Sequence, residues 1–173
     1  MRIAITGTPG VGKTTTAQEL SEYLGFTHVN VSEVASDMGA VITKEGDTSV
    51  VNIDILKEKL DMDDIIIDSH FAEVFEVDFV FVLRCEPKVL YKRLEERGYS
   101  KEKIKENVMA EILDYCLVNS LIYHEPEQIF EVYTNFVEEI VLIVENPQRQ
   151  TKRSLAYGSR THFLTEENLQ LVE

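Results

Sequence analysis

The stretch GTPGVGKT, residues 7–14, decides the fold, because it fits the pattern GxxxxGK[ST] in full. An apolar run, Arg2 to Thr6, precedes it, and Lys13 to Leu24 follows with apolar residues at helical spacing. Glycines allow backbone N–H groups to curl round a phosphate, and a following helix offers its N-terminal donors to the same anion. The alternative is a glycine-rich turn that matches by chance, but eight residues in register between a strand and a helix favour a phosphate-binding loop.

Individual residues of this loop have distinct expected roles on a nucleotide. Gly10 and Gly12 let the backbone approach the phosphates, and Lys13 places a point charge near the β- and γ-phosphates. The Thr14 hydroxyl can ligate Mg²⁺, while Thr15 is close enough to donate to a more inward phosphate. We therefore expect a nucleotide with Mg²⁺ at this loop.

A second nucleotide element is the acidic end of the apolar run Ile65 to Ile67. Asp68 follows the run directly, as the Mg²⁺-orienting aspartate follows its strand in phosphate-loop proteins; a simple strand-end carboxylate is the alternative. His70 lies two residues further on, at the rim where α/β sheets place their ligands. Because a lone histidine is more often structural or exposed, both a functional and a structural role stay open for His70.

Two arginines, Arg93 and Arg97, are four residues apart in a stretch with helical spacing, so they share one face. Two guanidinium groups aimed at one place suit a phosphoryl group in transfer, and such arginines can supply about 10³ to 10⁵ in rate. Glu95 and Glu96 lie alongside, so the alternative is a salt-bridged surface helix. The phosphate loop earlier in the chain favours the catalytic interpretation.

Short apolar runs alternate with longer amphipathic stretches along the chain. Strands are expected at residues 2–6, 26–31, 65–67, 78–83 and 129–133. Helices are expected at residues 13–24, 53–60, 87–96, 101–123 and 137–146. Three of the strand runs are nearly continuous apolar, as is typical of strands covered on both faces of a parallel sheet. The pattern predicts an α/β domain with right-handed βαβ crossovers.

Composition and charge exclude several classes of protein. The 173 residues suffice for one domain, and 44% hydrophobic with 28% charged residues argue against a disordered or fibrous chain. A net charge of −14 disfavours unaided binding to nucleic acid and would attract a basic partner. The longest apolar run, Ile140 to Val144, is too short to cross a bilayer. Cys85 and Cys116 form no CxxC pair, which predicts reduced core thiols in a cytoplasmic protein.

The end of the chain differs from the rest in charge. Residues 148–162 contain four basic side chains and no acidic one, and residues 1–147 alone carry −15. One interpretation is a solvated, flexible C-terminal extension; the other is a docking arm, for RNA or for the domain's own acidic face. We therefore expect one domain over residues 1–147 and an extension over residues 148–173.

Further motifs narrow the class of phosphate-loop protein. No Asn is followed by Lys, which argues against a guanine-reading GTPase. Other motifs are GTPGVGKTT at 7–15, Asn30-Val31, Asp68-x-His70, FVLR at 81–84, LYKRLEERGY at 90–99, Asn107 and Glu111-Ile112. In these residues the chain resembles the adenylate kinase isoenzyme 6 family, whose archaeal members are adenylate kinases by name. The resemblance covers residues 1 to about 147.

The resemblance implies a fold, an activity and partners. The fold is that of P-loop nucleoside monophosphate kinases: a five-stranded parallel sheet flanked by helices, with a short monophosphate-binding region, here about 30–53, and a short lid, here about 98–108. Members are described as adenylate kinases (ATP + AMP to 2 ADP) or broader nucleoside monophosphate kinases that also hydrolyse ATP. They act in late maturation of the small ribosomal subunit, at the 3′ end of its rRNA, and bind a basic platform protein of that subunit.

Functional residues follow from the resemblance only at matching positions. Contacts to ATP are implied for Gly10, Gly12, Lys13, Thr14, Thr15 and Arg97. Asp68 and His70 would serve Mg²⁺ and the positioning of water or of the acceptor, with Thr14 and Asp68 as the metal-binding pair.

The chain departs from ordinary adenylate kinases where those enzymes hold the AMP phosphate. They place one arginine in the monophosphate-binding helix and another after the third strand, whereas residues 34–37 and 69–72 here contain none. Arg84 or Lys44 are the candidates to substitute. An acceptor phosphate held by fewer cations should bind weakly, because each charge-assisted hydrogen bond is worth about 1.5 to 3 kcal/mol. The departure favours a larger share of ATP hydrolysis.

Three functions stay open at this point. The first is transfer of the ATP γ-phosphoryl group to a nucleoside monophosphate, with Lys13 and Mg²⁺ holding the triphosphate, Arg93 and Arg97 neutralising developing charge, and a lid excluding water. The second is an ATP-driven assembly factor that binds a basic protein and has negligible kinase activity. The third is a kinase for a non-nucleotide hydroxyl, against which the Asp-x-His and RGY motifs argue.

Overall fold

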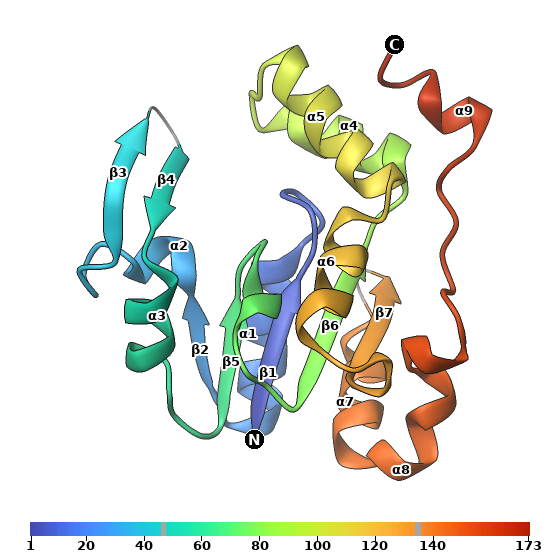
Figure 1. Ribbon diagram of the computed structural model, residues 1–173. Helices are drawn as coiled ribbons and strands as arrows, with labels where there is room; N and C mark the ends of the chain where they lie inside the picture. Colours follow the sequence, from blue (N-terminus) through green and yellow to red (C-terminus); the bar gives the residue numbers. More distant parts are fainter. Residues whose placement is uncertain (46–47, 134–135) are drawn as a thin grey trace.

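A five-stranded parallel sheet forms the centre of the computed structural model, which describes residues 1–45, 48–133 and 136–173 (Figure 1). Its strand order is β2-β5-β1-β6-β7, and every pairing within it is parallel. The strands are β1 (Arg2–Thr6), β2 (Thr27–Asn30), β5 (Ile65–Asp68), β6 (Phe79–Arg84) and β7 (Ile129–Tyr133). All five predicted strands are confirmed, and every boundary lies within one residue of its expected position.

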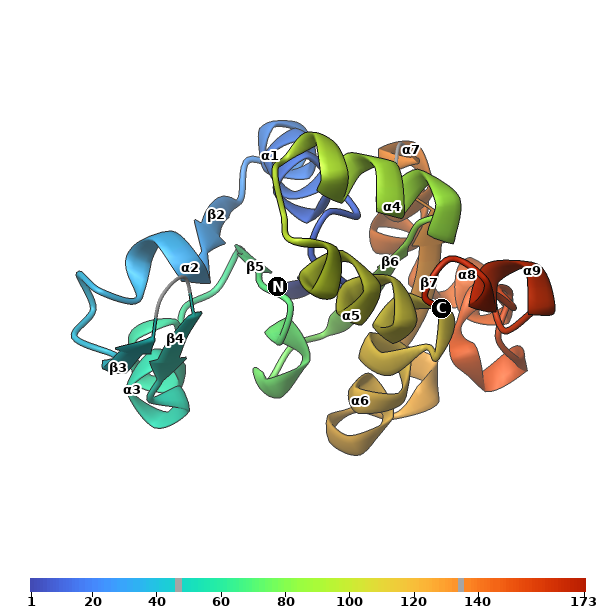
Figure 2. The same ribbon diagram turned by 90° about the horizontal axis from the view of Figure 1, so that it is seen from above.

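Helices cover both faces of this sheet because the strand residues alternate between two hydrophobic clusters. Ile3 and Ile5 of β1 belong to one cluster and Ala4 to the other, and all three are fully buried. The main helices are α1 (Lys13–Leu24), α3 (Ile53–Lys59), α4 (Pro87–Glu96), α5 (Lys101–Ile112), α6 (Tyr115–Tyr123) and α7 (Val137–Glu145). Seen from above, α1 and α7 lie on one side of the sheet and α6 on the other (Figure 2).

The single helix predicted over residues 101–123 is wrong, because the chain breaks between α5 and α6. Asp114 adopts a left-handed conformation with φ of 56°, which ends one helix and starts the next in a new direction. Aspartate tolerates this region better than most residues, and the Asp114 carboxylate accepts a hydrogen bond from the Arg84 guanidinium. The break leaves α5 above the carboxyl edge of the sheet and lets α6 pack against β6 and β7.

A small β-hairpin lies apart from the main sheet and had no counterpart among the predicted strands. Strands β3 (Val41–Glu45) and β4 (Thr48–Val51) pair antiparallel, and the short helix α2 (Val31–Val34) precedes them. The hairpin projects beyond the edge strand β2 in Figure 1. It falls inside the expected monophosphate-binding region, residues 30–53, of which positions 46 and 47 lie outside the described residues.

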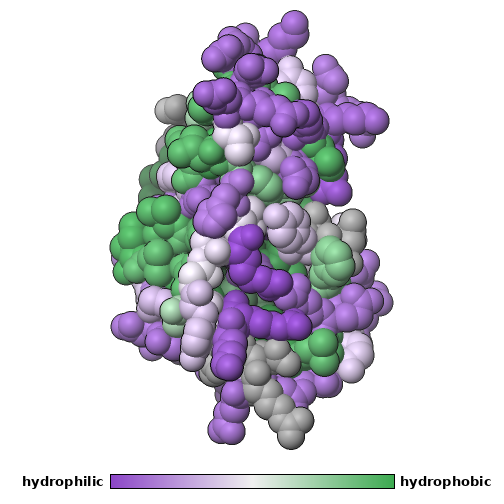
Figure 3. All heavy atoms as spheres, turned by 90° about the vertical axis from the view of Figure 1, so that its right-hand side faces the viewer, coloured by the Kyte–Doolittle hydropathy of each residue, from purple (hydrophilic) through white to green (hydrophobic). Residues whose placement is uncertain are grey.

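The C-terminal segment packs back on the domain. It contains short helical turns: α8 (Pro147–Gln150), η3 (Thr151–Arg153), η4 (Leu155–Tyr157) and α9 (Glu166–Leu169). Leu169, Leu171 and Val172 pack against the core cluster, and the Lys105 ammonium donates to the main-chain oxygen of Glu173 at 2.6 Å. Figure 3 shows this face of the molecule, which is largely hydrophilic. These contacts favour the docking of the arm on the domain's own surface over a frayed extension.

Two short 3₁₀ turns complete the described elements: η1 (Ala72–Val74) follows β5, and η2 (Pro126–Gln128) precedes β7. Within the described parts of the chain, none of the helices combines the length and the apolar character needed to span a bilayer.

Candidate active site

The glycine-rich loop connects β1 to α1 at the carboxyl edge of the sheet, and its backbone geometry requires glycine at two points. A Cβ atom on Gly7 would lie 2.7 Å from the carbonyl oxygen of Leu83, and Gly7 has a φ of 142°. A Cβ atom on Gly10 would lie 2.9 Å from Leu94 Cδ2, and its φ is 96°. The loop therefore fits tightly between the end of β6 and helix α4, and it turns directly into the N-terminus of α1.

Polar side chains from the ends of two strands, Asn30 of β2 and Asp68 of β5, meet Thr14 in the first turn of α1. The Thr14 hydroxyl donates to Asp68 Oδ2 at 2.7 Å, and the Asn30 amide donates to the same carboxylate oxygen at 3.2 Å and to Thr14 Oγ1 at 3.3 Å. His28 Nε2 lies 3.5 Å from Asp68 Oδ2. Asp68 is buried with 2% exposure, so its orientation is fixed by these neighbours.

Thr14 and Asp68 offer a donor set that fits Mg²⁺. Both supply hard oxygen atoms, and Mg²⁺ in nucleotide sites is held by one or two protein oxygens together with phosphate oxygens and waters. Within the described residues, no group of three or more histidine, cysteine or acidic side chains could hold a metal ion by itself. The pair is therefore suited to a metal that arrives with a nucleotide.

The Lys13 side chain folds back over the phosphate loop and is held there by main-chain carbonyl groups of the loop. Its ammonium donates to the carbonyl oxygens of Gly7 at 2.8 Å and Thr8 at 3.2 Å. Burial lowers the pKa of Lys13 below its ordinary value, and the negative charge of Asp68 partly opposes this effect. A buried ammonium gains most from a phosphate as partner, because the low local dielectric strengthens the attraction.

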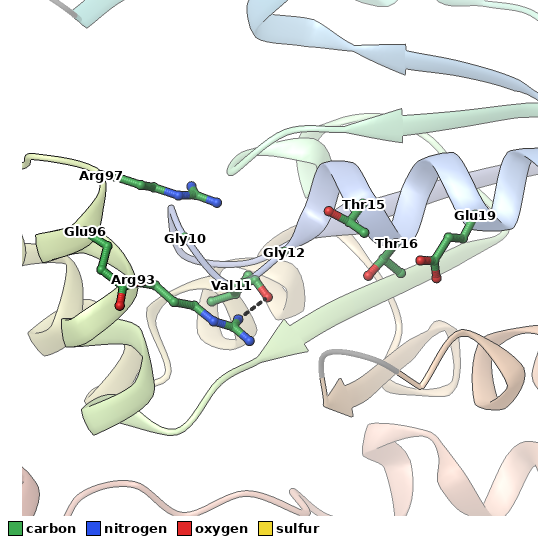
Figure 4. Close-up of a pocket in the computed structure, with 9 residues that line it drawn as sticks. All are labelled: Gly10, Val11, Gly12, Thr15, Thr16, Glu19, Arg93, Glu96 and Arg97. Atoms are coloured by element: carbon green, nitrogen blue, oxygen red, sulfur yellow. Dashed lines mark hydrogen bonds between the residues drawn. The ribbon is translucent and has the colours of Figure 1, made fainter.

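Arg93 and Arg97 stand across the loop from α1 and line a cavity of about 340 Å³ (Figure 4). The cavity is lined by Gly10, Val11, Gly12, Thr15, Thr16, Glu19, Arg93, Glu96 and Arg97. Arg93 donates to the carbonyl oxygen of Val11 at 3.4 Å, and Figure 4 shows Arg97 extending toward the loop near Gly10. In the described part of the chain neither arginine pairs with a carboxylate within 4.0 Å, whereas on the same helix Lys92 pairs with Glu96 at 3.8 Å. The structure thus brings the two predicted arginines, Thr15 and the loop together.

His70 lies at the rim next to Asp68 but contacts none of the other predicted site residues through a hydrogen bond. Its side chain is exposed, and its ring meets the Phe71 ring edge-on with centroids 4.9 Å apart. Partial desolvation of the ring lowers the pKa of His70, and the charges of Lys13 and Lys103 lower it further. The imidazole is therefore neutral near pH 7.

Several polar residues around the site were not predicted as site residues, although Asn30 and Glu111 belong to the motifs that carry the family resemblance. His28 and Asn30 come from β2, and their position at a strand end beside β5 is the signal that could have found them. Thr8 and Glu111 form a buried hydrogen bond of 2.6 Å between the loop and α5. No spacing rule links residues 103 positions apart, so the sequence carried no signal for this contact.

Arg84 cannot serve as a substitute for the missing acceptor arginines, which corrects one sequence-based interpretation. Its side chain is 1% exposed, and its guanidinium is held by the carboxylates of Glu111, Glu131 and Asp114. Removing a guanidinium from three carboxylates would leave those buried charges unpaired, at a large cost. Lys44, the other candidate, lies in β3, and its side chain is outside the described part of the structure.

Comparison with known proteins agrees with this geometry. A family model described as "AAA domain" matches residues 3–114, which include the loop, Asp68 and both arginines. A shikimate kinase structure from Acinetobacter baumannii superposes with a TM-score of 0.60 at 17% identity, covering 85% of this chain and 94% of that one. At that identity the likeness supports the fold alone, and it confirms the predicted P-loop kinase fold.

Relatives in archaea are much closer in sequence. A protein named "Putative adenylate kinase" from Pyrococcus abyssi is 42% identical over 156 residues, covering 84% of this chain and 85% of the relative. A protein of the same name from Pyrococcus furiosus is 45% identical over 129 residues, covering 72% and 71%. The phosphate loop, the Thr14–Asp68 pair and the two cavity arginines, Arg93 and Arg97, thus lie in a chain that belongs to the family of archaeal proteins named "Putative adenylate kinase".

Proposed function

We propose that this protein is an ATP-dependent nucleoside monophosphate kinase of the adenylate kinase type (ATP + AMP to 2 ADP) with intrinsic ATPase activity. The observation that carries the proposal is the contact of Thr14 with Asp68 at 2.7 Å, beside Lys13 and opposite Arg93 and Arg97. That arrangement would supply a phosphate-binding loop, a pair of oxygen ligands for a metal and two cations, all at the carboxyl edge of the sheet. The names of the archaeal relatives support the same reaction class, a phosphotransferase.

The triphosphate would be held from the loop side. Backbone N–H groups of Gly10 and Gly12 and the hydroxyl of Thr15 donate to phosphate oxygens, and Lys13 exchanges its carbonyl partners for the β- and γ-phosphates. Thr14 and Asp68 would hold Mg²⁺, which when bound neutralises charge on the phosphates. Asn30, which donates to both side chains, keeps the two oxygens aligned.

Negative charge that develops on the phosphoryl group during transfer would be stabilised by Arg93 and Arg97, at and just after the end of α4. Arg93 is already anchored near the loop through Val11, and Arg97 sits at the end of the helix where the chain turns toward α5. The region about 98–108, the expected lid, comprises the turn after this helix and the first part of α5, and it would exclude water when it closes. His70 and Asp68 are placed to orient the acceptor or a water molecule at the rim.

An ATPase assembly factor is the second candidate, and the state of Arg84 favours it. Arg84 is occupied by three carboxylates, and the chain has no other arginine between Arg2 and Arg93. The acceptor phosphate would therefore bind with fewer cations than in ordinary adenylate kinases, and water would compete as acceptor. The net charge of −14 suits a basic partner, which we propose to be a platform protein of the small ribosomal subunit in late maturation of its rRNA 3′ end.

We also propose that the protein acts in the cytoplasm. Cys85 and Cys116 are both buried and unlinked by a disulfide, and burial raises the pKa of Cys116 to about 12, so it stays a protonated thiol.

A time course with Mg·ATP, with and without AMP, separates the two candidates when ADP and free phosphate are both resolved. A kinase makes two ADP for each ATP consumed, only when AMP is present, and releases little phosphate. An ATPase releases phosphate equal to ADP and ignores AMP, which would contradict the kinase proposal. The variant Lys13→Ala serves as the blank for contaminating activity.

The role of the two cavity arginines in phosphoryl transfer is tested with Arg97→Ala and a matched control variant on helix α4. Loss of a cation that stabilises the transferring group lowers turnover by about 10³-fold, whereas Lys92→Ala, at an exposed position paired with Glu96, leaves turnover unchanged. An Arg97→Ala variant within about threefold of the wild-type kcat would contradict the assigned role.

The assembly-factor candidate is tested by a pull-down of the platform protein with ATP, with ADP and without nucleotide. A nucleotide can reset a complex only if the partner binds the two nucleotide states with different affinity. Equal recovery in all three conditions would therefore exclude nucleotide-driven release.

A further inference from the structure

A chain of buried polar side chains connects the phosphate loop to the C-terminal segment. Thr8 Oγ1 donates to Glu111 Oε2 at 2.6 Å, and Arg84 Nε donates to Glu111 Oε1 at 2.9 Å. Arg84 Nη1 donates to Glu131 Oε1 at 2.7 Å, and the backbone N–H of Arg160 donates to Glu131 Oε2 at 2.6 Å. Thr8, Glu111, Arg84 and Glu131 are each no more than 4% exposed.

The segment Arg160–Phe163 completes this network in two ways. First, the backbone N–H of Arg160 donates a hydrogen bond to Oε2 of Glu131, whose side chain is buried. Second, the Phe163 ring covers the guanidinium of Arg84, with Cζ 5.2 Å from the ring centroid, and meets the Tyr133 ring edge-on at 6.3 Å. Phe163 is 4% exposed, so it shields the ion pairs from water.

Charge makes the network sensitive to each of its members. Burial disfavours the charged form of Arg84, but Glu111 and Asp114 outweigh this effect and hold the pKa of Arg84 above its ordinary value. Glu111 accepts from Thr8, Arg84 and the backbone N–H of Cys85, so its position is fixed by three donors. In a low-dielectric interior, loss of one member shifts or weakens the remaining bonds.

We propose that Arg160–Phe163 is a positioning element for the phosphate loop, acting through Glu131, Arg84 and Glu111 on Thr8. Nucleotide affinity then depends on whether the C-terminal segment is docked. Thr8 does not line the cavity beside the loop, and neither do the network residues beyond it: Glu111, Arg84, Glu131, Arg160 and Phe163. These residues therefore act through the loop and not on the ligand. The inference rests on the proposed function to the extent that the loop binds nucleotide.

The first test replaces Glu131 with Gln, which keeps the shape but removes the charge and one acceptor. We expect Glu131→Gln to weaken the binding of Mg·ATP at least fivefold in a calorimetric titration, the lower end of the usual range for coupling between sites. The matched control is Glu145→Gln at the end of α7. Glu145 is exposed and accepts from the Tyr23 hydroxyl at 3.3 Å, outside the chain to Thr8, and its replacement should leave affinity within about twofold.

A double-mutant cycle separates a route through Thr8 from a general loss of stability. Thr8→Val removes the hydroxyl that ends the chain, so Glu131→Gln added to Thr8→Val should change affinity by less than about twofold. A purely structural role predicts the same fold-change in both backgrounds, and that result would overturn the inference. Phe163→Leu, which keeps an apolar side chain but removes the ring from Arg84, should follow the pattern of Glu131→Gln and decides the question if that variant does not fold.

Failure of the inference and failure of the proposed function give different results. If wild-type protein does not bind Mg·ATP, the proposed function is wrong and the inference falls with it. If wild-type protein binds Mg·ATP and both Glu131→Gln and Phe163→Leu bind it equally well, only the inference is wrong.

Discussion

Two buried glutamates near the loop differ in how their charge is compensated. Glu111 is surrounded by three donors, one of them the Arg84 guanidinium. Glu73, in the turn after β5, is 2% exposed and accepts one side-chain hydrogen bond, from Thr6 Oγ1 at 2.6 Å. Burial therefore raises the pKa of Glu73 above its ordinary value, although the bond from Thr6 and the charge of Lys13 oppose this effect.

We expect Glu73→Gln to make stability less dependent on pH. Below the ordinary carboxyl pKa of 4.5, Glu73 is protonated in both the folded and the unfolded state and favours neither. As the pH rises above 4.5, the unfolded chain loses the proton first, so stability falls until the folded-state pKa is passed. Glutamine does not titrate and can still accept from Thr6. Urea midpoints should therefore favour the variant more at pH 8 than at pH 4, and parallel pH profiles would contradict the raised pKa.

At this scale the sequence indicated the residues of the loop, Asp68 and the arginine pair, because each belongs to a local pattern. It could not indicate that Arg84 is sequestered, since Glu111, Asp114 and Glu131 come from other elements and meet only in the folded chain. Charge pairing over such sequence distances has no spacing rule. Arg84 therefore looked available as a phosphate ligand when it is held as part of the core.

At the scale of elements, long periodic segments were predictable and local breaks were not. Helix α4 matched its expected bounds because Pro87 starts it and apolar spacing continues to its end. The break at Asp114 was missed because the apolar pattern continues across it, and only the carboxylate's bond to Arg84 and the left-handed backbone mark it. The hairpin β3–β4 was missed because its β-branched residues form short runs, and three of them, Val41, Ile42 and Val50, are exposed, so they give no clear alternation.

Helix α5 contributes to the expected lid at its N-terminus and to the buried polar network at its C-terminus, so the stability of its N-terminus affects both. The helix begins in the expected lid region and carries Glu111 in its last turn. Ser100 caps it by accepting a hydrogen bond from the backbone N–H of Lys103 at 3.2 Å. Ile104, Val108 and Ile112 anchor one face in the core.

Ser100→Ala should lower the free energy of unfolding by about 1 kcal/mol, the usual cost of a lost N-cap. Ser100→Asp is the matched variant, because a carboxylate can cap the helix and also interacts favourably with its N-terminal dipole. Urea unfolding of the two variants should place Ser100→Asp at or above the wild-type stability. Equal destabilisation by both substitutions would mean that the serine is held by something other than the cap.

For the whole molecule, the C-terminal segment links distant parts of the domain. Arg153 and Arg160 bind Glu139 of α7, Phe163 covers Arg84, and Lys88 of α4 pairs with Glu167. The segment thus runs from the foot of the sheet to the helices above its carboxyl edge (Figure 1). Its positive charge over residues 148–162 meets a domain that carries −15, so electrostatic attraction assists the docking.

Removal of residues 148–173 should therefore destabilise the domain well beyond the loss of a loose tail. Loss of the buried Phe163 ring alone should cost about 3 to 5 kcal/mol, by analogy with Phe→Ala changes in cores, and Glu131 also loses the Arg160 N–H. The chain 1–164 is the informative control, because it keeps Arg160 and Phe163 but lacks α9, its surface pair with Lys88, which is worth about 0 to 1 kcal/mol, and the partly buried side chains of Leu169, Leu171 and Val172. In urea unfolding we expect the chain 1–147 to have a much lower midpoint than the chain 1–164. If the chain 1–147 unfolds at the same urea concentration as the full chain, the segment is a flexible extension, and the domain is complete without it.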